Sequence, residues 1–210
     1  KTTTCDYFPV EKEYGYSVFS TVFYAEFLNK KLNVIDCPGS DDFVGNAITA
    51  LTVTDTGVNL IDGQYGVEVG TQNIYRTCEQ LKKPIIFAIN QLDGEKAAFD
   101  NSLLQLREHY GNKVVPIQFP INCGPSFNSM IDVLLMKQYS WGPEGGVPTI
   151  TEIPEEYKEK ALEMHQQLVE AAAENDEGLM DKFFEQGALS EDELRLGIRK
   201  GLVDRSIFPV

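Results

Sequence analysis

The chain has 210 residues, a formal net charge of −14, 42% hydrophobic residues and 24% charged residues. This length is enough to bury a sizeable core, and the composition is ordinary for a globular protein. No apolar run approaches the roughly 20 residues that a membrane-spanning helix needs, and the first residues lack the apolar stretch of a signal peptide. These features argue against a membrane protein.

The cysteines and the first residue bear on the setting of the chain. We expect reduced thiols in a cytoplasmic protein, because the four cysteines are widely separated and fit no paired metal-ligand spacing. They are Cys5, Cys37, Cys78 and Cys123. The chain begins without Met and enters a charged segment at once, as expected of a piece cut from a longer protein.

The first 110 residues alternate between strand and helix patterns. Aromatic and β-branched residues predict a strand from Tyr16 to Phe27, and after the turn "LNKK" the run "LNVID" predicts its hairpin partner, which ends at Asp36. The next predicted elements are a helix over Val44 to Leu51, a strand at "GVNLID", a helix over Thr71 to Leu81 and a buried parallel strand at "PIIFAIN". This order predicts an α/β domain with a mainly parallel sheet, whose ligands bind at the carboxyl ends of the strands.

The second half has a different pattern. Short strands are predicted at "KVVPIQFPI" and "MIDVLLMKQYSW", and three helices follow. The first helix starts at Pro154, the second is "GLMDKFFEQG", and the third begins with a capping box of Ser190 and Glu193, flanked by a staple of Leu189 and Leu194. The apolar stripe of the first of these helices consists of Tyr157, Ala161, Met164, Leu168 and Ala172.

The negative charge is concentrated in the second half. From Thr151 to Arg195 there are fourteen Asp and Glu residues against four Lys and Arg residues. Such a surface repels phosphate, so it disfavours direct binding of free DNA or RNA. A solvated helix face and a docking surface for a basic protein both fit the pattern.

Two short motifs lie where predicted strands end. In "DCPG", Asp36 can hold the water shell of Mg²⁺, and Gly39 lets the backbone N–H approach a phosphate closely. In "NQLD", Asp93 can accept hydrogen bonds from N1–H and the exocyclic amine of guanine, and the amide of Asn90 can meet the base edge. Either motif alone also fits a plain turn. The order of the two motifs in the chain, and the position of each after a predicted strand, together favour a guanine-nucleotide site.

With these motifs, the chain resembles a known family, the translational GTPases, and in particular the amino-terminal region of elongation factor G. The switch segments of that family resemble "CDYFPVEKEYGYSV" and "DCPGSDDFVG", and its helix, strand and guanine-reading loop resemble "GVEVGTQNIYRTCEQLKKPIIFAINQLD". The segments from "PIQFPINCGPSFNSMIDVLLMKQYSW" to "IRKGLVDRSIFPV" are similar to the sub-domain inserted in the GTPase domain.

The resemblance implies a P-loop-type GTPase core, truncated here, over residues 1–110 and an inserted α+β sub-domain over residues 111–210 that returns to the core. It implies that Ser17 and Asp36 attend Mg²⁺, Asp36 through water, and that Asn90 and Asp93 read guanine. The implied GTP-binding set is completed by Cys37, Pro38, Gly39 and Gln91. Cys37 is most simply a small substitute for the family's threonine.

Two positions depart from the family pattern. Gln91 stands where the family has lysine, so a stem that can pack on the base remains but its charge is lost, and we expect weaker nucleotide affinity. Ser40 stands where the family has the histidine thought to orient the attacking water. Serine is too short and too weakly basic for that task, so we expect weak or altered GTP hydrolysis.

The resemblance therefore predicts a divergent elongation factor G-like paralogue that binds GTP or GDP and Mg²⁺ and acts on the ribosome during translocation, with its acidic sub-domain meeting the ribosomal stalk. A ribosome-docking module without hydrolysis and a ribosome-protection or release-type GTPase are the alternatives. The phosphate-binding loop Gly-x-x-x-x-Gly-Lys-Ser/Thr does not occur in the chain. We expect that loop upstream, and we expect this chain by itself to be inactive and to bind GTP weakly or not at all.

Overall fold

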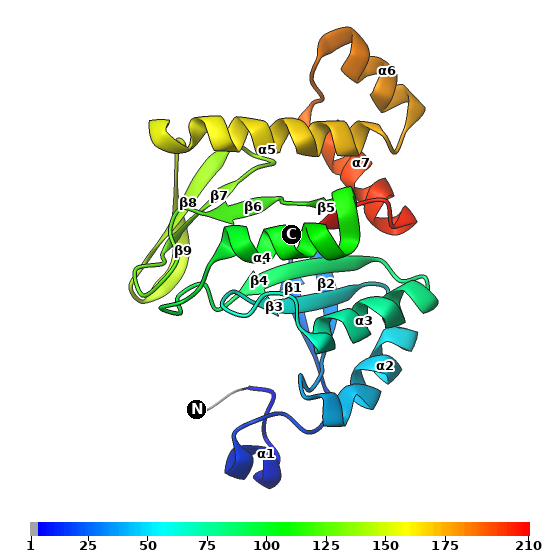
Figure 1. Ribbon diagram of the computed structural model, residues 1–210, viewed down its shortest axis with the longest axis vertical. Helices are drawn as coiled ribbons and strands as arrows, with labels where there is room; N and C mark the ends of the chain where they lie inside the picture. Colours follow the sequence, from blue (N-terminus) through cyan, green and yellow to red (C-terminus); the bar gives the residue numbers. More distant parts are fainter. Residues whose placement is uncertain (1–3) are drawn as a thin grey trace.

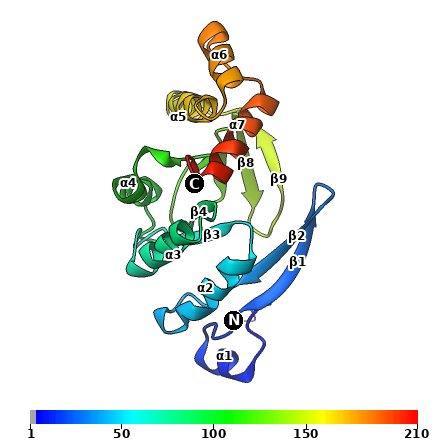
Figure 2. The ribbon, with the colours of Figure 1, turned by 90° about the vertical axis from the view of Figure 1, so that its right-hand side faces the viewer.

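In the computed structural model, which describes residues 4–210, the amino-terminal part holds a short helix and a hairpin. The helix lies at one end of the molecule, and the hairpin extends from there toward its middle (Figures 1 and 2). Helix α1 spans Pro9–Tyr14, and strands β1 (Thr21–Phe27) and β2 (Lys30–Asp36) pair antiparallel. The turn residues Leu28 and Asn29 have φ of 46° and 58°, as in the two-residue turn that matches strand twist. The hairpin prediction is confirmed, except that the strand begins at Thr21 and the predicted strand residues 16–20 form a loop.

The central part alternates between strands and helices. Strands β3 (Gly57–Asp62) and β4 (Ile85–Asn90) pair in parallel, with Gly57 opposite Ile85 and Asp62 opposite Asn90. The other elements are η1 (Asp41–Phe43), α2 (Val44–Val53), α3 (Val69–Gln80), α4 (Phe99–Tyr110) and η2 (Gly111–Lys113). The helices predicted over Val44 to Leu51 and over Thr71 to Leu81 correspond to α2 and α3, and their ends agree to within two residues. Helix α4 was not predicted.

The remaining strands form two further sheets. Strand β5 (Val114–Val115) pairs in parallel with β10 (Phe208–Pro209), which also packs beside β4. An antiparallel sheet has the order β6-β7-β8-β9. Its strands are β6 (Gln118–Pro120), β7 (Ser129–Asp132), β8 (Lys137–Gly142) and β9 (Gly145–Thr151), the last of which was not predicted.

Three helices complete the fold. They are α5 (Glu155–Ala173), which lies along the antiparallel sheet in Figure 1, α6 (Glu177–Gln186) and α7 (Glu191–Asp204). All three were predicted, and the capping box is present, with Oε2 of Glu193 accepting the N–H of Ser190 at 3.0 Å. The Ser190 hydroxyl also donates to that oxygen, at 2.8 Å. Within residues 4–210, no helix is both long and apolar enough to cross a membrane.

The α/β class is thus confirmed, with small sheets of which two in the described chain are parallel. The predicted domain division at residue 110 stays a prediction. Strand β10 follows that residue in the sequence, yet it packs beside β4, which precedes it.

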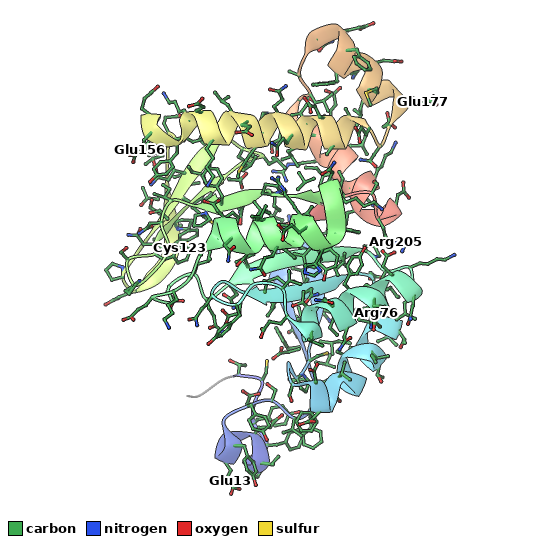
Figure 3. All side chains as sticks on the ribbon, in the orientation of Figure 1. Glu13, Arg76, Cys123, Glu156, Glu177 and Arg205 are labelled. Carbon is green, nitrogen blue, oxygen red and sulfur yellow. The ribbon has the colours of Figure 1, made fainter. Side chains whose placement is uncertain are left out.

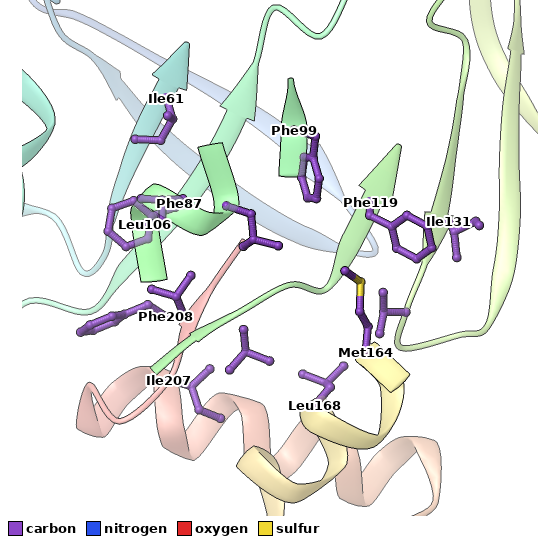
Figure 4. Packing of buried hydrophobic residues seen from close by; sticks show 14 of the residues in the cluster. Ile61, Phe87, Phe99, Leu106, Phe119, Ile131, Met164, Leu168, Ile207 and Phe208 are labelled. Carbon is purple, nitrogen blue, oxygen red and sulfur yellow. The ribbon is translucent and has the colours of Figure 1, made fainter. Parts of the chain in front are cut away.

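One hydrophobic cluster runs from the parallel strands to α5 and α7 (Figure 4). Leu106, Ile131, Leu168 and Phe208 in this cluster are fully buried. At its centre, Phe87 stacks on Tyr110 with ring centroids 5.1 Å apart, and Phe208 meets Phe87 edge-on at 6.2 Å. Because this core fixes β4, it also fixes the loop that begins at Asn90.

Helices α5 and α7 approach closely at a glycine, which gives a stability prediction. A Cβ at Gly197 would lie 2.5 Å from the carbonyl oxygen of Ala172, so Gly197→Ala must push the helices apart. We expect a loss of about 1–3 kcal/mol in the free energy of unfolding, measured by urea denaturation. The matched control is Gly45→Ala in α2, where a Cβ meets no atom within 4 Å and a small gain is expected. Equal stabilities of the two variants would contradict the prediction.

Candidate functional site

The segment that contains Ser17 folds around the short helix α1. Pro9 is the first helical residue, and Gly15 ends the helix at φ 76° with its N–H donating to the carbonyl of Glu11 at 2.8 Å. Ser17 follows two residues later, and its hydroxyl donates to Oδ1 of Asp6 at 2.7 Å. The predicted metal-binding hydroxyl therefore lies against a carboxylate.

Asp36 is the last residue of β2 and faces Thr21 across the hairpin. The thiol of Cys5 hydrogen-bonds to the Asp36 carboxylate, which, together with burial and the charges of Asp36 and Asp6, raises the pKa of Cys5. The same backbone segment is tied to β1, since the hydroxyl of Thr21 donates to the carbonyl of Cys5 at 3.0 Å. The charge of Asp36 thus acts on Cys5, and the neighbouring Asp6 accepts the hydroxyl proton of Ser17, so adjacent residues interact with each of the two predicted metal ligands.

Cys37 and Pro38 form the start of the turn after β2. The Cys37 sulfur accepts a hydrogen bond from the Ser20 hydroxyl at 3.5 Å and lies 3.8 Å from the carbonyl oxygen of Ile35, toward which the thiol donates. Pro38 is buried. This turn is consequently anchored to the segment after Ser17 on one side and to its own strand on the other.

Gly39 is exposed, and nothing in the described chain requires glycine there. Its φ lies outside the left-handed region, and a Cβ added to it would meet no atom within 4 Å. An open approach to its backbone is what a phosphate oxygen needs to reach a main-chain N–H. The residue therefore fits the predicted phosphate contact.

Ser40 precedes the short helix η1, and its carbonyl accepts the N–H of Phe43 at 3.0 Å. Its side chain is exposed and makes no capping hydrogen bond. The next residue, Asp41, lies close to the first turn of α3, since a Cβ at Gly70 would be 3.6 Å from Oδ1 of Asp41. The turn therefore lies beside α3 at Asp41, while the Ser40 side chain is exposed to solvent.

The chemistry of the donors fits Mg²⁺. Ser17 offers a neutral hydroxyl oxygen and Asp36 a carboxylate oxygen, and small hard cations prefer oxygen ligands and keep several waters. Neither sulfur nor imidazole is needed for such a site. Ser17 and Asp36 could hold Mg²⁺ directly or through water, with the remaining ligands supplied by water and phosphate.

The predicted base-reading motif begins at Asn90, the last residue of β4. Gln91 has φ 56°, which turns the chain sharply out of the strand. The carbonyl of Asn90 accepts the N–H of Gly63 at 2.9 Å, and a Cβ at Gly63 would lie 2.9 Å from that oxygen. Gly63 therefore allows the close approach that fixes the start of the motif to the end of β3.

The rest of the motif is held from a second direction. Leu92 is buried, and its carbonyl accepts the N–H of Gly124 at 2.7 Å. The N–H of Gly94 donates to the carbonyl of Gln91 at 3.1 Å and closes the turn. Asp93 and Asn90 are left exposed on a loop whose backbone is fixed, which is the arrangement that recognition of a planar base requires.

The structure thus assembles two groups of predicted residues. Ser17, Asp36 and Cys37 are joined through contacts of residues 5, 6 and 20, whereas Asn90, Gln91 and Asp93 share one loop. Within residues 4–210, β2 pairs only with β1 and β3 only with β4, so no strand pairing joins the two groups. That both groups serve one ligand stays a prediction.

Reasoning from the sequence missed Asp6, Glu11 and the glycines that support the base-reading loop. A signal for the first segment was present, because "FPVEKEYG" places proline at the start and glycine just past the end of a short helix. No local pattern marks Gly124 as a support of Leu92, since 32 positions separate the two residues.

Comparisons with known proteins bear on the family to which the chain belongs. The family described as elongation factor Tu GTP binding domain matches residues 1–193. An "Elongation factor G-like protein" of Thermotoga maritima is 32% identical over 209 residues, which cover 100% of this chain and 30% of the relative. A crystal structure of a Thermus thermophilus protein superposes with a TM-score of 0.90 at 29% identity, covering 100% of this chain and 31% of the other.

The chain therefore spans about a third of the length of these relatives. The matched family covers nearly the whole chain, and the structural likeness extends over all of it. The matched range contains all of the predicted site residues. The chain accordingly belongs to the translational GTPases that carry the elongation factor Tu type of GTP-binding domain, and over its whole length it is similar to an elongation factor G-like protein.

Proposed function

We propose that the chain is the GTP-binding part of a cytoplasmic elongation factor G-like protein that promotes ribosomal translocation, with weak or altered GTP hydrolysis. The observation that supports this most directly is the hydrogen bond from Ser20 to Cys37 together with the pairing of Thr21 with Asp36, which joins the segment after Ser17 to the turn after β2. It draws two segments of the predicted phosphate side together at one strand end. Membership of a translational GTPase family supplies the guanine nucleotide and the ribosome as ligands to test.

On the phosphate side, Asp36 holds the water shell of Mg²⁺ and Ser17 offers its hydroxyl oxygen, while the N–H of Gly39 approaches the γ-phosphate. Bound Mg²⁺ supplies neutralisation of the negative charge that phosphoryl transfer spreads over the phosphate oxygens. The anchoring of Cys37 and Pro38 keeps this turn in place. The chain's own part is therefore to hold and orient the phosphate end.

On the base side, Asp93 accepts from the two donors of guanine and Asn90 meets the base edge through its amide. Adenine lacks that pair of donors, so its binding would leave the Asp93 carboxylate unmatched. Gln91 lies between the two residues, and its aliphatic stem can pack on the base without the charge of a lysine.

A second candidate function, a ribosome-docking module that hydrolyses GTP slowly or not at all, is favoured by Ser40. Its short exposed side chain can donate or accept one hydrogen bond but cannot act as an imidazole does. A ribosome-protection or release-type GTPase is a further alternative that uses the same site.

The acidic surface of helices α5 and α6 suits a basic binding partner, and we propose that this partner belongs to the ribosomal stalk. Glu156 near the start of α5 and Glu177 at the start of α6 mark the two ends of this surface in Figure 3, and both are exposed. A helix of the length of α5 extends about 28 Å, which is long enough to dock a small basic domain.

Nucleotide binding by the full-length protein tests the proposal. We expect Mg²⁺-dependent GTP binding that is about 10²-fold or more tighter than ATP binding, because only guanine matches Asp93, and we expect GTP to increase co-sedimentation with ribosomes. Calorimetry and ribosome pelleting measure the two effects. Equal affinities for GTP and ATP would sink the proposal, and GTP turnover with and without ribosomes then separates the translocase from the docking module.

A further inference from the structure

Glu11 is a buried carboxylate in an otherwise exposed helix. It is 1% exposed, whereas Lys12, Glu13 and Tyr14 beside it are exposed. Removing a carboxylate from water is costly unless hydrogen bonds replace the lost hydration. The position of Glu11 therefore requires donors from the surrounding chain.

Those donors are backbone N–H groups that come before and after Glu11 in the sequence. Oε1 of Glu11 accepts the N–H groups of Val18 at 3.0 Å and Phe19 at 3.1 Å, and Oε2 accepts the N–H of Phe8 at 3.2 Å. These bonds hold the pKa of Glu11 below its ordinary value, chiefly through the bond from Val18. The Glu11 side chain thus joins the backbone of residue 8 to the backbone of residues 18 and 19.

The segment that Glu11 closes contains Ser17. The backbone of the next two residues is fixed by Glu11, and the hydroxyl proton of Ser17 is held by Asp6 at 2.7 Å. A serine hydroxyl has one proton to donate and two lone pairs to offer. With its proton committed to Asp6, the Ser17 oxygen keeps its lone pairs for a cation.

We propose that Glu11 is the positioning residue of the first switch segment: by binding the N–H groups of Val18 and Phe19 it fixes Ser17 for Mg²⁺ contact. This inference rests on the proposed function, since it takes Ser17 as a ligand of the nucleotide-bound metal. In this proposal Glu11 acts through the backbone of Val18 and Phe19. Its contribution is geometric, as for the outer groups that orient metal ligands elsewhere.

The test uses the full-length protein with Glu11→Ala, Glu11→Gln and the control Glu13→Gln. Glu13 lies on the same helix and points outward at its tip (Figure 3). Two quantities are measured: hydrogen exchange of residues 8–19 without nucleotide, and the Mg²⁺ concentration at which half of the bound GTP is retained.

Glu11→Ala should speed exchange at Val18 and Phe19 and raise the Mg²⁺ midpoint, each by about tenfold or more. Glu11→Gln should give exchange rates and a Mg²⁺ midpoint between those of the unaltered protein and Glu11→Ala. Its Oε1 can still accept two N–H groups, but its amide NH₂ group is a donor and faces the N–H of Phe8. The control should change neither quantity.

Unchanged exchange in Glu11→Ala would overturn the inference, and so would faster exchange with an unchanged Mg²⁺ midpoint. If the unaltered protein binds no GTP, the proposed function fails and the metal role of Ser17 fails with it. Normal GTP binding by the unaltered protein, with Glu11→Ala indistinguishable from it, would instead reject the role of Glu11 alone.

Discussion

Replacing Ser40 by histidine is expected to raise the ribosome-stimulated kcat of the full-length protein by about 10²-fold or more. The reason is chemical, because phosphoryl transfer depends on a group that orients the attacking water and on charge near the transferred phosphate. The Ser40 side chain is exposed and makes no capping bond, so an imidazole can be accommodated without repacking the turn. Multiple-turnover GTP hydrolysis with and without ribosomes measures the effect.

The matched control is Ser40→Ala, which removes the hydroxyl without adding a base. We expect its turnover to equal that of the unaltered protein, and we expect ribosome binding to stay the same in both variants. Two results would contradict the prediction. One is turnover by the unaltered protein as fast as that of a histidine-bearing relative, and the other is no gain in Ser40→His. Either result would mean that another group orients the water.

The strand ends of both motifs were predictable because local patterns define them. Apolar runs placed Asp36 at the end of β2 and Asn90 at the end of β4, and the structure has both residues there. The same holds for α7, where the capping box of Ser190 and Glu193 marks the helix start within the sequence itself.

Longer-range contacts explain where the sequence misled. The aromatic and β-branched residues from Tyr16 to Ser20 have strand propensity, but Glu11 takes the N–H groups of Val18 and Phe19 and keeps this stretch out of the ladder. Strand β9 contains two glycines and Pro148, which weaken the strand pattern, and it forms all the same because it lies at the edge of its sheet.

The α4 helix was missed although its pattern was readable. Phe99, Leu103, Leu106 and Tyr110 recur at steps of four, three and four, and the first three are buried. The contacts that build the candidate site are of another kind. Cys5 to Asp36 and Asp6 to Ser17 cross 31 and 11 positions, so only the folded hairpin and loop bring them together.

Replacing Asp93 by asparagine is expected to lower GTP affinity of the full-length protein by about 10²-fold or more and to shift its preference toward xanthosine triphosphate. A hydrogen bond to a charged acceptor is worth about 1.5–3 kcal/mol, and the introduced amide would turn one of two acceptors into a donor that faces the guanine amine. Xanthine carries an oxygen in place of that amine, so the same amide donor finds a partner. Competition binding with the two nucleotides gives the ratio of affinities.

The control Glu95→Gln makes the same carboxylate-to-amide change two residues away, at an exposed side chain, and should alter neither affinity. Equal losses for both nucleotides in Asp93→Asn would point to damage of the loop, and an unchanged GTP affinity would remove Asp93 from the site. The backbone bonds that hold this loop, from Gly124 to Leu92 and from Gly94 to Gln91, do not involve the Asp93 side chain. A reversal of nucleotide preference would therefore report on contact between Asp93 and the base itself.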